Sequence, residues 1–175
     1  GLIGVAGAGG LLLTQGYRME RITVWLDPAA SEKGHQTIQG LYAIGSGGLF
    51  GKGLGQSMQK LGFLPEANND MIFSVICEEL GLFGALCVLA LFFALIWRFM
   101  VIAVNAPDLY GSMIVVGVIA HIGIQVFINI AVATNTIPNT GIPLPFISYG
   151  GSSLVFMLLE MGLVLSVSRY INVKK

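Results

Sequence analysis

The sequence contains few charged residues. Only 10% of its 175 residues are Asp, Glu, Lys or Arg, whereas about one quarter is usual for soluble domains. Hydrophobic residues make up 55% of the chain, which is typical of a membrane protein rather than of a soluble domain with a large core. Basic and acidic residues balance at nine each. Because there is no basic excess and no basic cluster, nothing in the sequence indicates a nucleic-acid partner.

Cysteine is also scarce. The two cysteines, Cys77 and Cys87, lie in one apolar segment, where we expect them to act as small hydrophobic residues. Their spacing fits neither a disulfide framework nor a metal site. The chain starts at Gly1 without a basic segment or cleavage site before its first apolar run, so no signal peptide is visible. We expect the sequence to begin inside a transmembrane helix.

Long apolar runs with few charges predict transmembrane helices. About 20 apolar residues are needed to cross a bilayer, and residues 71–104, 109–134 and 152–173 are long enough to do so. Residues 1–13 are apolar but too short, so we interpret them as the end of a truncated span. The sequence therefore predicts an all-α polytopic membrane protein.

Two polar loops separate these segments. The first covers residues 14–70, and its start mixes aromatic and basic side chains in the manner of a segment at the membrane interface. Loops of this length are usually functional or disordered. Scattered aromatic and aliphatic residues argue against disorder, so we expect short helices packed on the membrane surface. The second loop covers residues 135–151 and is rich in Pro and Gly.

The distribution of basic residues predicts the orientation. The 135–151 loop contains no Lys or Arg, whereas Arg98, Arg169 and the last two lysines lie near the other helix ends. By the positive-inside rule, the turn at 105–108 and the C-terminus are cytoplasmic. Both polar loops then lie outside and face each other.

Four carboxylates gather where the long loop meets the first complete span. Glu66 and Asp70 precede the apolar run, and Glu78 and Glu79 follow within it. Asp70 suits an N-cap, but in a pocket it would suit a general base or a ligand of a divalent cation. At ~100° per residue, Glu78 lies about 80° from Asp70 around the helix and Glu79 about 180°. Glu78 therefore shares the side of Asp70 more closely.

The segment GSGGLFGKG resembles a phosphate-binding loop only superficially. The Walker A pattern requires Gly at the position of Ser46 and Ser or Thr at the position of Gly53. Two interpretations remain. Its backbone amides and Lys52 could approach a phosphate, or the segment is a set of flexible turns.

A polar stripe marks residues 109–134. His121, Gln125 and Asn129 recur every four residues and therefore share one helix face. The stripe either forms interhelical hydrogen bonds or lines a polar cavity. Glu160, in the middle of the last span, has this stripe as its most plausible partner.

Two longer stretches resemble a known family. AIGSGGLFGKGLGQSMQKLGFLPEANNDMIFSVICEELG resembles the large outer loop and following helix of the SEDS family, which includes FtsW, RodA and SpoVE. GIPLPFISYGGSS at 141–153, with Asn129 upstream, resembles the C-terminal signature of that family. The resemblance covers nearly the whole chain and is closest to the FtsW and SpoVE branch. It implies the C-terminal part of a ten-helix bundle.

The resemblance also implies an activity. Members of the family are peptidoglycan glycosyltransferases, which polymerise lipid II into glycan strands at the outer face of the bacterial inner membrane during division, elongation or sporulation. They work with a class B penicillin-binding protein and other divisome or elongasome membrane proteins. Asp70 matches the acid thought essential for catalysis. The alternatives are a lipid II flippase that uses the polar stripe and a non-catalytic divisome scaffold in which Asp70 only caps a helix.

Further residues are candidates for contact with the substrate. We predict that Lys52 and Lys60 help to hold the anionic lipid, and that Glu66, Glu78 and Ser148 also bind substrate. A divalent cation, Mg²⁺ or Mn²⁺, is the expected cofactor, with no organic cofactor. The 175 residues alone are expected to be inactive without the preceding helices of the family.

Overall fold

The computed structural model describes residues 21–28, 34–57 and 69–171. Within these ranges every regular element is helical. The main helices are α2 (His35–Ser46), α3 (Ile72–Val104), α4 (Leu109–Ala133) and α5 (Gly151–Arg169), and residues 21–26 form a further short helical segment. The predicted all-α class is confirmed. The predicted truncated span at 1–13 lies outside the described residues.

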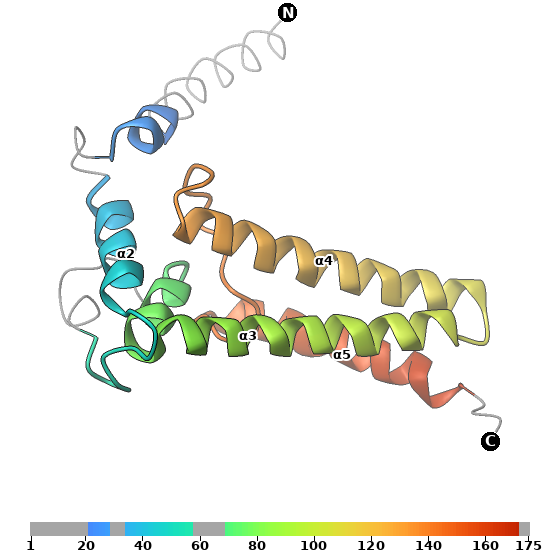
Figure 1. Ribbon diagram of the computed structural model, residues 1–175. Coiled ribbons are helices and arrows are strands. Elements are labelled where there is room, and N and C mark those ends of the chain that lie inside the picture. Colours follow the sequence, from blue (N-terminus) through green and yellow to red (C-terminus); the bar gives the residue numbers. More distant parts are fainter. Residues whose placement is uncertain (1–20, 29–33, 58–68, 172–175) are drawn as a thin grey trace, which may run out of the picture.

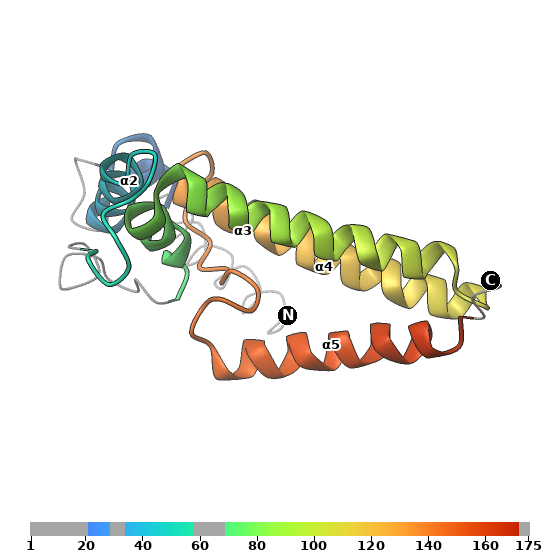
Figure 2. The same ribbon diagram turned by 60° about the horizontal axis from the view of Figure 1, so that its bottom comes forward.

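Three of the helices are long and apolar enough to cross a membrane, namely α3, α4 and α5. Figures 1 and 2 show α3 and α4 side by side and antiparallel, with α5 running along the same pair. Helix α2 lies across the end of this group where α3 begins. The described parts of the two polar loops therefore meet at one end of the transmembrane helices, and the α3–α4 turn lies at the other.

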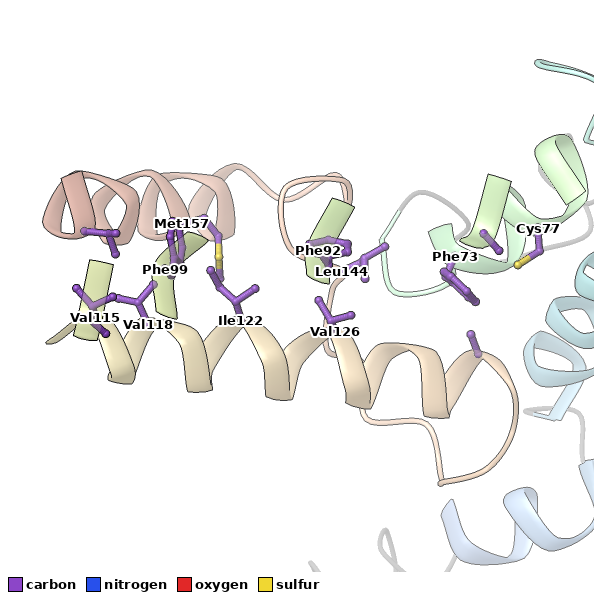
Figure 3. Close-up of a cluster of buried hydrophobic side chains, with 14 residues drawn as sticks. Phe73, Cys77, Phe92, Phe99, Val115, Val118, Ile122, Val126, Leu144 and Met157 are labelled. Carbon is purple, nitrogen blue, oxygen red and sulfur yellow. The ribbon is translucent and has the colours of Figure 1, made fainter. Parts of the chain in front are cut away.

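The core lies between α3, α4 and α5 (Figure 3). All three helices supply buried side chains to it, and Leu144 of the 135–151 loop joins them beside Phe92. The transmembrane members include Phe92, Phe99, Val115, Val118, Ile122, Val126, Met157 and Val164. Many other apolar side chains on these helices remain exposed, as expected where lipid or further helices cover them.

The short α3–α4 turn is fixed by a cap. Asp108 has an extended backbone, and its Oδ2 accepts a hydrogen bond from the Gly111 amide at 3.1 Å. A carboxylate at this position satisfies one of the free amides at the start of a helix. The cap explains why α4 begins directly after the turn.

Helix α3 is broken at Gly81. Its φ and ψ are 68° and −165°, a combination that is essentially restricted to glycine. The break divides α3 into a short helix, residues 72–80, and a long helix, residues 82–104. The sequence interpretation treated this segment as one continuous helix and was wrong on this point, because a single glycine inside an apolar run gives no clear signal of a break.

Candidate functional site

The glycine-rich segment after α2 packs against the break in α3. The amides of Leu82 and Phe83 donate to the carbonyls of Gly48 and Leu49, at 2.9 and 3.1 Å. In return, the amides of Lys52 and Gly53 donate to the carbonyls of the two glutamates before the break, both at 2.9 Å. Residues 47–57, called the glycine loop below, therefore cap both half-helices at once.

Glycine is required where the two backbones meet. A Cβ on Gly51 would lie 2.2 Å from the Glu79 carbonyl oxygen, and a Cβ on Gly81 would lie 2.3 Å from the Gly51 nitrogen. The glycine loop is thus a fitted structural element and not a set of flexible turns. The amides of Lys52 and Gly53 are occupied by these carbonyls, which leaves them unavailable to a phosphate.

Glu78 holds the glycine loop in place. Its side chain is fully buried, and its Oε1 lies 2.7 Å from the Lys52 Nζ while its Oε2 accepts from the Ser57 hydroxyl at 2.5 Å. A buried carboxylate is tolerated only when it is paired and hydrogen-bonded. Glu78 and Lys52 were predicted to bind substrate. The structure shows both groups engaged with each other, and their contact with substrate stays a prediction.

Replacing Lys52 by Met should destabilise the full-length protein. The buried Glu78 carboxylate would lose its cation but keep the hydroxyl donors of Ser46 and Ser57, and losing a hydrogen bond to a charged group costs about 1.5–3 kcal/mol. Thermal unfolding in detergent should therefore show a lower midpoint for Lys52→Met. Lys52→Arg keeps the charge and serves as control. Equal midpoints for wild type and Lys52→Met would contradict the assignment of Lys52 as the structural partner of Glu78.

Asp70 lies at the other end of the short helix. The helix begins at Ile72 with Met71 in the N-cap position and no side-chain cap, so Asp70 precedes the cap. The interpretation of Asp70 as the N-cap is therefore wrong. Its Oδ2 lies 3.9 Å from the position that a Cβ would take on Gly141. Asp70 is half-buried and Gly141 is exposed, so the carboxylate stands at the edge of the 135–151 loop beside a residue without a side chain.

Two polar side chains join the backbone of Asp70 to that loop. Asn129 of α4 is buried, and its Nδ2 donates to the carbonyls of Asp70 and Ile142, both at 2.8 Å. The Ser148 hydroxyl donates to the Asn69 carbonyl at 2.6 Å and accepts from the Leu144 amide at 2.7 Å. Asn129 and Ser148 therefore act as a clamp that fixes where the Asp70 backbone lies. Their predicted roles, as a cavity-lining and a substrate-binding residue, stay predictions.

The start of the long loop also contacts the 135–151 loop. The Trp25 Nε1 donates to the Asn135 carbonyl and the Arg21 Nη1 to the Asn139 carbonyl, both at 2.9 Å. Asn139 in turn donates from its Nδ2 to the Gln36 Oε1 of α2 at 3.3 Å. Segments from both polar loops are thus held together around the end of α3 that begins near Asp70.

The polar stripe of α4 divides into two parts. His121 Nδ1 lies 2.6 Å from Glu160 Oε1 of α5, so the predicted partnership between Glu160 and the stripe is confirmed. Gln125 lies between this pair and Asn129, and its Oε1 is buried without a hydrogen-bond partner in the described part of the chain. Within the stripe, His121 therefore links α4 to α5, and Asn129 links α4 to the clamp.

The site residues predicted from the sequence do not all come together. Asp70, Asn129 and Ser148 meet at the clamp, whereas Lys52 and Glu78 lie at the far end of the short helix, about 12 Å away at 1.5 Å per residue. Lys60 and Glu66 lie outside the described residues. The sequence interpretation missed the role of Gly141. The feature of the sequence that could have indicated this role is a glycine between prolines, in a loop expected on the same side of the membrane as Asp70.

A cavity of about 220 Å³ lies between α4 and α5 at the opposite end of these helices. It is lined by residues of the α3–α4 turn, including Asp108 and Tyr110, and by the end of α5. This cavity is separated from Asp70 by the length of α4, so it plays no part in the site.

The fold and the site together define a multi-pass helical membrane protein with a half-buried carboxylate where its two polar loops meet. The model of the FtsW, RodA and SpoVE family of cell cycle proteins matches residues 1–173. The chain belongs to this family.

Two relatives show the closeness to the FtsW and SpoVE branch. The stage V sporulation protein E of Bacillus subtilis is 56% identical over 174 residues, which cover 97% of this chain and 47% of the relative. A probable peptidoglycan glycosyltransferase FtsW of Geobacter sp. strain M18 is 44% identical over 170 residues, which cover 96% of this chain and 46% of the relative. The chain thus spans about half the length of these relatives.

Solved structures agree with the fold. A structure described as a peptidoglycan synthase complex, which coordinates polymerization and crosslinking, superposes with a TM-score of 0.68 at 29% identity, over 99% of this chain and 49% of that one. The crystal structure of the rod shape determining protein RodA of Thermus thermophilus gives a TM-score of 0.57 at 38% identity, over 75% of this chain and 39% of that one.

Proposed function

We propose that the complete protein is a peptidoglycan glycosyltransferase that polymerises lipid II at the outer face of the bacterial inner membrane. The observation that carries the proposal is the position of Asp70. Its carboxylate is half-buried at the entrance of a transmembrane helix, beside the exposed Gly141, and its backbone is clamped by Asn129. The FtsW relative is named a probable peptidoglycan glycosyltransferase, which supports the same activity.

The reaction joins a sugar hydroxyl of one chain to the anomeric carbon of a lipid-linked sugar. The bond from that carbon to the lipid pyrophosphate breaks, a glycosidic bond forms, and the hydroxyl loses its proton. Asp70 is the group that accepts this proton, a role that typically contributes a factor of about 10² to 10⁴ in rate. At the rim of the bilayer, the polyprenyl tail stays in lipid while the saccharide lies in water.

Asp70 could also hold a divalent cation. Within residues 21–28, 34–57 and 69–171 no group of three His, Cys, Asp or Glu side chains comes together, so the described residues offer one carboxylate there. Mg²⁺ is commonly bound through one or two carboxylates together with substrate phosphates and water, and Asp70 fits this arrangement. When bound, such an ion would neutralise charge on the pyrophosphate.

The partner and the orientation belong to the same proposal. The structural neighbour is a peptidoglycan synthase complex, which supports a class B penicillin-binding protein as the partner that crosslinks the strands. The basic residues near the ends of α3 and α5, Arg98 and Arg169, support a cytoplasmic C-terminus and outer polar loops.

The test is direct. The full-length protein, purified with its class B penicillin-binding protein, should convert lipid II into long glycan strands that separate on a gel. Vesicles that carry the same complex should show no faster passage of fluorescent lipid II between leaflets than empty vesicles. Translocation without polymer would overturn the proposal in favour of a flippase. Absence of both activities in a folded complex would favour the scaffold.

A further inference from the structure

The glycine loop presents three large apolar side chains to its surroundings. Leu49, Phe50 and Leu54 are 64%, 83% and 76% exposed. Exposed apolar residues that occur singly need no explanation, whereas a group of them marks a surface that is covered in the working protein. The position of the loop relative to the membrane indicates what covers it.

The loop is level with the outer end of the apolar part of α3. Its carbonyls at Gly48 and Leu49 accept from the amides of Leu82 and Phe83, the first residues after the break. From Leu82, the first residue after the break, to Trp97 the long half of α3 carries no charge, which corresponds to about 24 Å of helix, most of the ~30 Å of a hydrocarbon core. Leu82 and Phe83 thus lie at the boundary of the hydrocarbon, and the loop lies beside them.

Several backbone groups of the loop are already paired, which lowers the cost of a position at the edge of the hydrocarbon. Polar backbone groups without partners are costly where no water can replace them. Besides the amides of Lys52 and Gly53 already described, the Gly51 amide donates to the Gly47 carbonyl at 2.8 Å and the Gln56 amide to the Gly53 carbonyl at 3.1 Å. The ammonium of Lys52 is paired with Glu78, so the cation of the loop is already compensated.

We propose that the glycine loop is a membrane anchor, with Leu49, Phe50 and Leu54 inserted among the lipid chains on the loop side of the bilayer. Lipid is the occupant because the apolar group lies level with the start of the uncharged helix and continues onto α3 at Leu82 and Phe83, which are 52% and 65% exposed. Since the loop is bonded to both sides of the break, its depth fixes the depth of the short helix that begins just after Asp70. This inference depends on the membrane-spanning role of α3 and not on the glycosyltransferase activity.

A fluorescent probe tests the anchor in the full-length protein. An environment-sensitive fluorophore is attached to Phe50→Cys in a Cys87→Ser background, since Cys87 is exposed and Cys77 is buried. The protein is placed in phosphatidylcholine vesicles with or without acyl-chain bromination. Gln56→Cys, an exposed polar position on the same loop, is the matched control. Leu54→Cys is a second probe site in case the first variant does not fold.

The anchor predicts a blue-shifted emission at position 50, quenched several-fold more strongly by brominated lipid than emission at position 56. Emission typical of water at positions 50 and 54, without extra quenching by brominated lipid, would overturn the proposal. The same conclusion would follow if the blue shift appeared only after a partner protein was added, because a protein would then cover the loop. No outcome depends on lipid II, so a failed anchor is distinguishable from a failed enzyme assignment.

Discussion

Asp70→Asn is expected to abolish glycan polymerisation by the full-length protein. The change removes the proton acceptor while keeping the shape of the side chain, and the Asn129 contact to the Asp70 carbonyl is untouched because it involves only the backbone. Loss of a general base typically lowers a rate by a factor of about 10² to 10⁴. The rate of strand synthesis from lipid II, measured with the penicillin-binding protein present, should fall by at least about 100-fold.

Asp108→Asn is the matched control for this loss. Asp108 is an acid at a helix start, and Asn caps helices about as well as Asp does. This variant should polymerise lipid II at the wild-type rate. A folded Asp70→Asn protein with full activity would contradict the catalytic assignment, and equal losses in both variants would indicate a general effect of removing an acid near a helix end.

Gly81→Ala is expected to disrupt the region around the glycine loop. The new Cβ would lie 2.3 Å from the Gly51 nitrogen and 2.6 Å from the Leu49 carbonyl oxygen, contacts that require the two backbones to separate. The backbone conformation at Gly81 adds about 1–3 kcal/mol of strain for any other residue. Hydrogen exchange should therefore become much faster at the amides of Lys52 and Gly53, and the thermal midpoint should fall.

Gly45→Ala provides the contrast. A Cβ at this position in α2 has no neighbour within 4 Å, and replacing a helical Gly by Ala stabilises by up to about 1 kcal/mol. Unchanged or higher stability is expected for Gly45→Ala. If Gly81→Ala behaved like Gly45→Ala, with protected amides in the glycine loop, the reciprocal capping of the break would be wrong.

The sequence was most informative about the transmembrane helices. Long, mostly apolar segments are the signal for α3, α4 and α5, which are long and apolar enough to cross a membrane. The four-residue spacing of His121 and its neighbours similarly identified the face that meets Glu160. These features are local or periodic, and they can be read from one stretch of chain.

The break at Gly81 and the clamp at Asn129 could not be predicted in the same way. The break exists because the glycine loop, some 30 residues earlier, supplies carbonyls and amides to both half-helices. The clamp depends on the Asp70 carbonyl, which is 59 residues before Asn129. The glycine loop and Asp70 both contribute backbone groups to these contacts. Backbone groups are the same in every residue, so the sequence does not indicate either contact.

The central claim is that Asp70 lies beside a lipid-linked saccharide during the reaction, and proximity tests it most directly. A photoreactive amino acid is introduced at Thr140, an exposed position next to Gly141, or at Tyr110, an exposed position at the opposite end of α4. The full-length protein with its partner is then irradiated in the presence of lipid II labelled in its sugars. The account predicts adducts from position 140 that excess unlabelled lipid II removes, and none from position 110. Labelling of position 110 alone, or of neither position in a complex that is synthesising strands, would contradict it.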